Sequence, residues 1–354
     1  MPRRPAPLPA SLTSPVFTAA EARRLGVTID RLRAGDLVRL GYGLYARKDA
    51  ELTERAVLGA LLREDHQIVV SGRSAARLWG MPLPLEMERW AATPQMSVMD
   101  MSLQGRVRRN RPYLRWTRRP LRGEDIVDVD GLRITSRVRT WLDLTVHLQS
   151  DQLVILADHL IRHPRPWAEG RDTPYATPDI LAAAIEAHPG RGRALLREAL
   201  SLARIGSDSP AETRLRLAAA RAGLPGPVLN RRQFEGRADL GEHDLAWPEW
   251  KVCLEHDGRD HRTKAQQEKD ITRRERREQH GWIEVQTVAN DLTDGCRRGI
   301  ERLTAALRRR GWEPGRSATG PRLGKYSRTA GTPILDGSRD ASSRSSAPQD
   351  GPRP

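Results

Sequence analysis

Two carboxylates in the C-terminal third of the chain have the spacing that a cation site requires. Asp244 and Glu255 lie in two apolar, strand-like segments, 243–247 and 251–256, and the turn at Pro248 predicts that these segments form a hairpin. Two carboxylates brought together on adjacent strands resist joint ionisation unless a cation neutralises them. Mg²⁺, or Mn²⁺ in its place, prefers oxygen ligands and can activate water for phosphodiester hydrolysis.

A third carboxylate, Glu212, is expected at the start of a helix. In Ser209-Pro-Ala-Glu212, the serine is a helix N-cap, the proline occupies the first helical position and the glutamate the third. Glu212 could hold a metal-bound water, although its position taken alone favours a capping role. Asp257-Gly258, which ends the second strand, is by itself a plain turn.

The elements that must position these residues alternate between helix and strand. The pattern predicts a helix over 209–222, strands over 228–234, 243–247 and 251–256, a charged helix over 264–280, a strand over 283–288 and a helix over 294–310. The order α-β-β-β-α-β-α predicts an α/β domain over residues 207–312.

This region resembles the PD-(D/E)xK nuclease superfamily, which has the restriction-endonuclease-like fold, in its branch akin to very-short-patch-repair endonucleases. The matching residues are Ser209–Glu212, Gly223–Pro225, Asp244–Glu249, Val252–Gly258, His261, Asp270, Arg273 and Gly281-Trp282. The resemblance implies a metal-dependent endonuclease in which Asp244, Glu255 and the backbone carbonyl of His256 bind the ion. It also implies that Glu212 is the helix carboxylate of the site.

The chain departs from this family pattern at two positions. Asp257, which the resemblance also places in the catalytic site, stands where the pattern has lysine. As a third carboxylate it could raise metal affinity, but a positive charge near the attacking water must then come from elsewhere. Arg277 stands where an apolar helix residue is expected. His261 could orient the scissile phosphate or transfer a proton. The candidates for the missing positive charge are Lys251, Lys264, Lys269 and Arg273.

The N-terminal segment 15–48 has the pattern of a winged helix-turn-helix. Thr18 and Glu21 form a capping box before a short helix, Thr28 begins a second helix, and strand-like runs flank a glycine turn. If the unit binds DNA, the second helix enters the major groove. Arg31 and Arg33 would then reach bases or phosphates, and Arg39 and Arg47 would contact the backbone. The alternative is a module used only for protein contacts.

The same segment and the region after it resemble the AbiEi-like type IV abortive-infection antitoxin family. The matching stretches are 17–26, 37–45, 70–80 and 135–143. The resemblance implies a regulator-like antitoxin architecture, not an enzyme, for residues 15–200, and a cognate toxin or another defence-system protein as partner.

Composition limits the remaining possibilities. The 354 residues carry 60 Lys+Arg against 45 Asp+Glu, a net charge of +15 that favours DNA or another nucleic acid as partner, although high arginine usage across the proteome would also produce it. The two cysteines exclude a disulfide framework, and no apolar run is long enough to span a membrane. The prolines that follow Arg3-Arg4 interrupt any export-signal core, so a cytoplasmic protein is expected.

The whole chain is therefore expected to be a multidomain α+β and α/β protein. We expect a disordered arm (1–14), the winged helix (15–48), a mostly helical antitoxin-like middle domain (49–206), the nuclease-like domain (207–312) and a disordered tail (313–354). The arginine-rich segment 106–122 fits either a phosphate-binding strip or a solvated strand edge. Two functions remain open: a Mg²⁺-dependent DNA endonuclease, or a non-catalytic antitoxin-like regulator with a vestigial nuclease fold.

Overall fold

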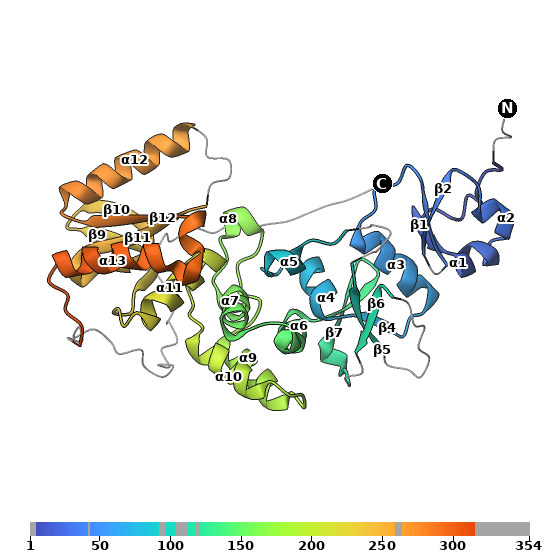
Figure 1. Ribbon diagram of the computed structural model, residues 1–354, viewed down its shortest axis with the longest axis horizontal. Helices are drawn as coiled ribbons and strands as arrows, with labels where there is room; N and C mark the ends of the chain where they lie inside the picture. The colour runs from blue at the N-terminus through green and yellow to red at the C-terminus, as the bar shows by residue number, and fades with distance from the viewer. Residues whose placement is uncertain are drawn as a thin grey trace, which may run out of the picture. The chain divides into compact units, whose positions relative to one another are not determined.

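A computed structural model describes residues 5–41, 43–91, 97–103, 112–117, 120–258 and 264–315, which belong to one compact unit (Figure 1). The coarse prediction of a mixed α/β chain with several sheets is confirmed. The finer domain boundaries stay predictions.

The N-terminal part is a small three-stranded sheet with two short helices. Its elements are β1 (Val16–Thr18), α1 (Ala19–Arg24), α2 (Ile29–Leu32), β2 (Leu37–Gly41) and β3 (Leu44–Arg47), with antiparallel strand order β1-β3-β2. Thr18 and Glu21 form the expected capping box, and the Thr28 hydroxyl accepts from the backbone N–H of Arg31. Phe17, Ala22 and Leu32 form the core under the helices, so the predicted helices and hairpin are confirmed.

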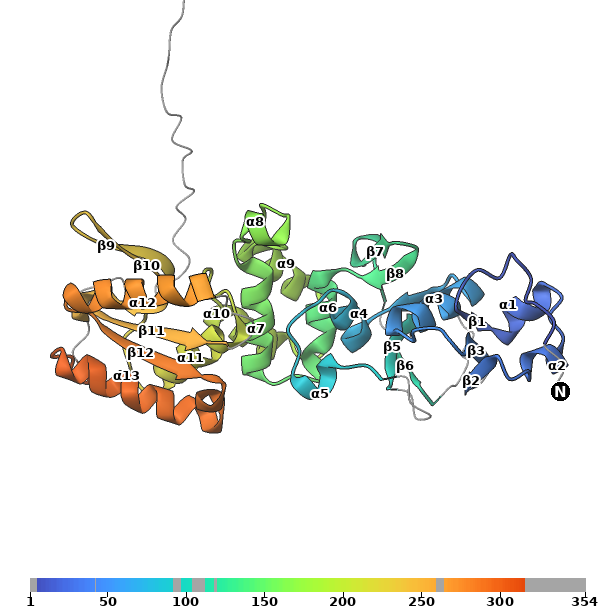
Figure 2. The ribbon, with the colours of Figure 1, turned by 90° about the horizontal axis from the view of Figure 1, so that it is seen from above.

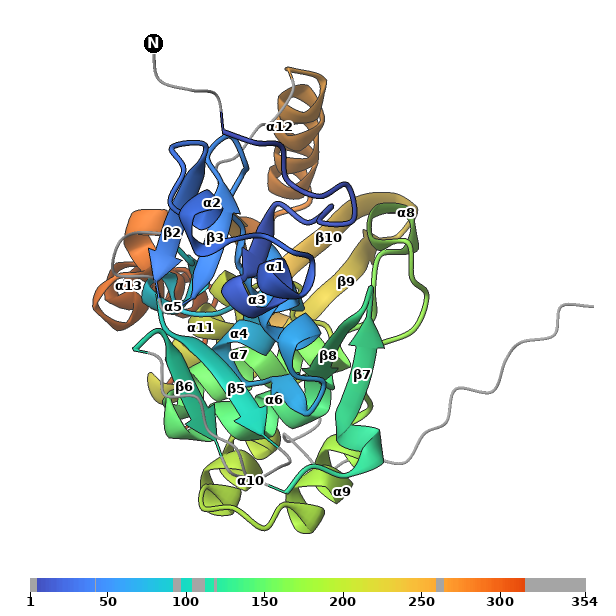
Figure 3. The same ribbon diagram turned by 90° about the vertical axis from the view of Figure 1, so that its right-hand side faces the viewer.

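The middle part contains a sheet that the sequence patterns did not predict beyond one hairpin. Strands β4 (Ile68–Val70), β5 (Met99–Leu103), β6 (Leu114–Thr117), β7 (Ile126–Val129) and β8 (Leu132–Thr135) form a five-stranded mixed sheet in the order β6-β5-β4-β8-β7. Figure 3 shows β5 and β6 on one side of this part and β7 and β8 on the other. The expected hairpin is β7–β8. The other strands were missed because β4 is only three residues long and β4 and β5 are buried almost throughout, so they show no polar–apolar alternation.

Helices make up the remainder of the middle part. They are α3 (Glu54–Glu64), α4 (Gly72–Leu78), α5 (Leu85–Glu88), α6 (Arg137–Asp143), α7 (Ser150–Ile161), α8 (Pro166–Glu169), α9 (Pro178–Ala187) and α10 (Arg193–Leu202). Trp141 is fully buried and donates its indole N–H to the Leu153 carbonyl at 3.0 Å. Trp141 and the α7 leucines are therefore part of the hydrophobic core of the middle part.

The C-terminal part has the predicted element order. It consists of α11 (Pro210–Arg221), β9 (Val228–Glu235), β10 (Ala238–Trp247), β11 (Val252–Asp257), α12 (Lys264–Gln279), β12 (Ile283–Val288) and α13 (Arg297–Arg309). The sheet order is β12-β11-β10-β9, with β11 and β12 parallel and the other pairs antiparallel. Helices α11 and α13 cover one face and α12 the other (Figures 1 and 2).

Among the described residues, no helix is both long enough and apolar enough to cross a membrane.

Candidate carboxylate site

The first turn of α11 fixes Glu212. Its backbone N–H donates to the Ser209 side chain at 3.2 Å, which confirms Ser209 as the N-cap. The Glu212 carboxylate accepts from the backbone N–H of Asp208 at 2.8 Å and from the side-chain amide of Asn230 in β9. Glu212 is only 6% exposed, so the carboxylate is held in one position between α11 and the sheet.

The β10–β11 hairpin places Asp244 beside the strand of Glu255. The pair farthest from the turn is Leu245 and Leu254. Asp244, which precedes Leu245, and Glu255, which follows Leu254, are the next residues on the two antiparallel strands. Asp244 Oδ2 accepts from the backbone N–H of His256 at 2.7 Å. The predicted hairpin thus brings both carboxylates to the point where the pairing of β10 with β11 ends.

Glu255 also has partners on the α12 side of the sheet. Its Oε1 lies 3.0 Å from His243 Nδ1 and 3.5 Å from Arg277 Nη1. Arg277 is 5% exposed and forms a 2.7 Å ion pair with Glu284. Arg277 stands where the sequence pattern predicts an apolar residue, and the structure gives it two acidic partners: the buried Glu284 and the partly buried Glu255.

Burial and neighbouring charges raise the pKa of all three carboxylates. Burial, together with the charge of the neighbouring Asp244, raises the pKa of Glu212 to about 7. Burial and the charge of Glu255 raise the pKa of Asp244 to about 7. Burial also raises the pKa of Glu255 to about 8 despite the opposing charge of Arg277. Carboxylate oxygens are the ligands that Mg²⁺ and Mn²⁺ prefer, so the chemistry of these residues suits such an ion, but among the described residues their oxygens do not form a group of three donors within 4.8 Å of one another.

A second possible donor set shares Glu255. His243 Nδ1, Cys253 Sγ and a Glu255 oxygen lie within 4.8 Å of one another. Arg277 Nη1 lies 3.2 Å from the same His243 nitrogen, which puts a positive charge at that place. Burial also raises the pKa of the Cys253 thiol well above its usual value, so the thiolate that a soft metal needs does not form readily. The set therefore fits a hydrogen-bonded ion pair better than a zinc site.

The remaining residues predicted for this site are distributed around it. The His256 carbonyl, proposed as a metal ligand, accepts from the backbone N–H of Gly258 at 3.1 Å. Asp257 is the last residue of β11 and is half-buried. On α12, Asp270 Oδ1 lies 3.6 Å from Arg273 Nη1. Lys251 pairs with Glu235 at 3.2 Å. His261 and the side chains of Lys264 and Lys269 lie outside the described residues.

The arginines predicted to bind nucleic acid in the N-terminal part have different environments. Arg31 pairs with Asp36 at 2.6 Å and its side chain is 11% exposed, so it serves the local structure. Arg47 donates to the Leu12 carbonyl at 2.7 Å. Arg33 and Arg39 are exposed.

The arginine-rich segment 106–122 is described only in part. Tyr113, an aromatic residue within this segment, is 5% exposed and belongs to the core of the middle sheet, so its ring is not accessible for stacking on a base.

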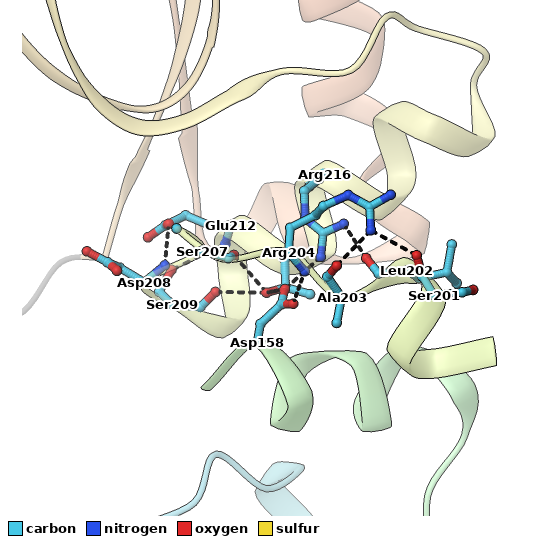
Figure 4. A network of polar contacts seen from close by, with 12 residues as sticks. Asp158, Ser201, Leu202, Ala203, Arg204, Ser207, Asp208, Ser209, Glu212 and Arg216 are labelled. Carbon is cyan, nitrogen blue, oxygen red and sulfur yellow. Dashed lines mark hydrogen bonds and ion pairs between the residues drawn. The ribbon is translucent and has the colours of Figure 1, made fainter. Parts of the chain in front are cut away.

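A buried network that the sequence analysis missed joins α7 to α11 (Figure 4). Asp158 is 1% exposed and accepts from Arg216 at 2.6 Å, from the Thr213 hydroxyl at 2.8 Å and from the backbone N–H of Arg204 at 2.7 Å. Thr213 directly follows Glu212, so the network anchors the turn that carries this carboxylate. The sequence signal was an acidic residue within the otherwise apolar helix around Leu156 and Leu160.

Comparisons with known proteins identify similar proteins, but the names of these proteins state no activity. Uncharacterized proteins from two Mycobacterium tuberculosis strains, CDC 1551/Oshkosh and ATCC 25618/H37Rv, are each 25% identical to this chain over 280 residues, which cover 79% of this chain and 94% of theirs. No family model matches the chain, and no solved structure matches it.

Proposed function

We propose that the chain is a DNA-binding protein whose C-terminal part is a Mg²⁺-dependent endonuclease of the PD-(D/E)xK type. The observation that carries the proposal is the gathering of Glu212, Asp244 and Glu255 at one end of the β10–β11 hairpin, where burial and mutual repulsion raise their pKa values. A divalent cation would relieve that repulsion. The α-β-β-β-α-β-α order around the carboxylates supports the same assignment.

Each carboxylate has its own role in this proposal. Asp244, Glu255 and the His256 carbonyl would hold Mg²⁺ or Mn²⁺, which supplies Lewis acidity and an activated water when bound. One Glu212 oxygen is already engaged by Asp208 and Asn230, so Glu212 is suited to orient a water rather than to be a main ligand. The pKa of Glu212, about 7, allows it to exchange a proton near neutral pH.

The test is incubation of plasmid, linear and single-stranded DNA with Mg²⁺ or Mn²⁺ and, in parallel, with EDTA. We expect metal-dependent cleavage by the wild-type chain that is abolished in Asp244→Asn and Glu255→Gln, while DNA binding is retained or strengthened. Glu249→Gln is the matched control, because Glu249 is an exposed glutamate in the turn of the same hairpin. Equal loss of DNA binding in the two site variants would contradict the metal-site assignment.

A non-catalytic antitoxin-like regulator is the second candidate. It is favoured by the contacts of Glu255 with His243 and Arg277, which give this carboxylate a structural use without a metal ion. Salt-sensitive DNA binding without cleavage of any substrate would support this function, and co-purification with a toxin or another defence-system protein would identify the partner.

A further inference from the structure

Arg165, at the start of α8 in the middle part, lies beside the carboxylate site. Its Nε and Nη2 contact Asp208 at 2.9 and 2.8 Å, and Nη2 also lies 3.2 Å from Glu242. The Asp208 backbone holds Glu212, and Glu242 precedes Asp244 by two residues in β10. Arg165 therefore contacts the segments that carry two of the three carboxylates.

The loop that carries Arg165 is fixed at both ends. Before the loop, Asp158 anchors α7 to α11 through Arg216 and Thr213. Within the loop, Glu169 binds the Arg162 guanidinium with two contacts of 2.7 Å and accepts from the Arg165 backbone N–H at 3.0 Å. The guanidinium is thus held in place before any ligand arrives, which lowers the entropic cost of binding.

Arg165 is also accessible, in contrast to Arg277. The Arg165 side chain is 41% exposed, whereas that of Arg277 is 6% exposed and paired with Glu284. The charge of Arg165 opposes the burial and the Glu255 charge that raise the pKa of Asp244. A phosphate entering a site lined by carboxylates needs an accessible positive charge, and a planar guanidinium fork suits phosphate oxygens.

We propose that Arg165 binds a phosphate of the nucleic-acid backbone at the carboxylate site, so that the middle part of the chain completes the substrate site of the C-terminal part. The inference rests on the proposed function of that site. Both ion pairs use Nε and Nη2, so they leave the Nη1 edge of the fork for the phosphate.

The experiment compares Arg165→Gln with Arg221→Gln. Arg221 is a matched control because it also joins the two parts, through an exposed ion pair between α11 and Asp151 of α7, but contacts none of the three carboxylates in the described structure. DNA affinity is measured in Ca²⁺ and in EDTA, and the cleavage rate in Mg²⁺. We expect Arg165→Gln to reduce the Ca²⁺-dependent affinity roughly tenfold and to lower the salt slope by about one phosphate contact, with Arg221→Gln near wild type.

A second pair of variants tests the proposal independently of folding. Glu242→Gln removes an exposed partner of Arg165, and Asp151→Asn does the same for Arg221. We expect Glu242→Gln to bind DNA more tightly than Asp151→Asn does. Equal affinities in this pair, or an Arg165→Gln variant that matches Arg221→Gln in affinity and rate, would overturn the inference.

The outcomes also separate this inference from the proposed function. Arg165-dependent binding in Ca²⁺ without cleavage in Mg²⁺ would support the phosphate contact of Arg165 and contradict the endonuclease activity. Cleavage that is insensitive to Arg165→Gln would support the endonuclease activity and contradict the phosphate contact. Absence of Ca²⁺-dependent binding by the wild-type chain would contradict both proposals.

Discussion

At the scale of residues, the three carboxylates should make stability depend on pH and on metal. Glu212, Asp244 and Glu255 have pKa values of about 7, 7 and 8 in the folded chain, against ordinary values of 4.5, 3.8 and 4.5. The folded chain therefore binds protons more tightly than the unfolded chain, and the free energy of unfolding should fall as pH rises from about 4 to about 8 in EDTA. The slope is on the order of 1.4 kcal/mol per pH unit for each proton lost on unfolding.

Mg²⁺ should reverse this loss, because it stabilises the ionised carboxylates. We expect thermal unfolding to show a larger Mg²⁺-induced rise in melting temperature at about pH 8 than at about pH 5. Asp244→Asn should flatten the pH dependence and reduce the Mg²⁺ effect. A Mg²⁺ effect of the same size at both pH values would show that the ion binds elsewhere.

Two aspartates on α7 allow a matched test of burial. Asp158 and Asp151 both pair with an arginine of α11, but the side chain of Asp158 is 2% exposed and that of Asp151 is 37% exposed. Asp158→Ala leaves Arg216 as a buried charge without its carboxylate and should cost about 3–5 kcal/mol. Asp151→Ala should cost about 0–1 kcal/mol. Urea unfolding measures both values, and equal costs would mean that water solvates Arg216 in the variant.

Sequence reasoning located the carboxylates but missed most of their polar partners. Asp244 and Glu255 follow from two short patterns joined by Pro248, because a hairpin fixes which residues become neighbours. The pairing of Arg277 and the role of Asp158 were missed because a buried charge looks like an error in an apolar pattern until its partner is known. Their partners, Glu284 and Arg216, lie in other elements.

At the scale of elements, prediction succeeded where strands and helices alternate with clear turns. The strand over 283–288 was predicted with the observed bounds, because glycine and charged residues separate it from its neighbours. Prediction missed most of the middle sheet because β4 pairs with β5 and β8, and β5 pairs with β6. The connections between these strands carry no turn signal in the local sequence. Which segments become strands of such a sheet depends on tertiary burial more than on the intrinsic strand propensity of their residues.

The start of α4 depends on a glycine that permits close approach to the middle sheet. Gly72 has φ of +53°, and a Cβ there would lie 3.0 Å from Asp100 Oδ2 and 3.1 Å from Asp100 Cβ. Gly80 has φ of +62° with no atom within 4 Å of the same position. We expect Gly80→Ala to cost about 1 kcal/mol from backbone strain, and Gly72→Ala to cost clearly more because buried Asp100 cannot move freely. Equal losses in chemical unfolding would show that Asp100 yields.

At the scale of the whole molecule, the net charge of +15 indicates attraction to nucleic acid, but it does not say which surface binds. Many arginines are engaged within the protein: Arg31, Arg216 and Arg277 all pair with carboxylates. The structure therefore separates arginines that hold the fold from those that remain exposed, such as Arg33 and Arg39. This separation could not be made from the sequence, in which Arg31 and Arg33 had the same expected role.

The distinction leads to a test of the N-terminal part as a DNA-binding unit. We predict that Arg33→Gln and Arg39→Gln each weaken DNA binding and reduce the salt slope by about one, because each removes a phosphate contact. Arg31→Gln should instead lower stability, since it breaks the pair with Asp36. Arg24→Gln, an exposed arginine at the end of α1, controls for the loss of one charge.

The same variants show whether the N-terminal part supplies DNA binding while the C-terminal part supplies cleavage. Loss of Arg33 and Arg39 should raise the DNA concentration needed for cleavage but leave the rate at saturating DNA unchanged, because neither residue contacts the carboxylate site within the described structure. Glu255→Gln should do the opposite: it should abolish the rate and preserve binding. If Arg33→Gln and Arg39→Gln instead bind DNA as tightly as Arg24→Gln does, the N-terminal part serves protein contacts, and the C-terminal part must find DNA by itself.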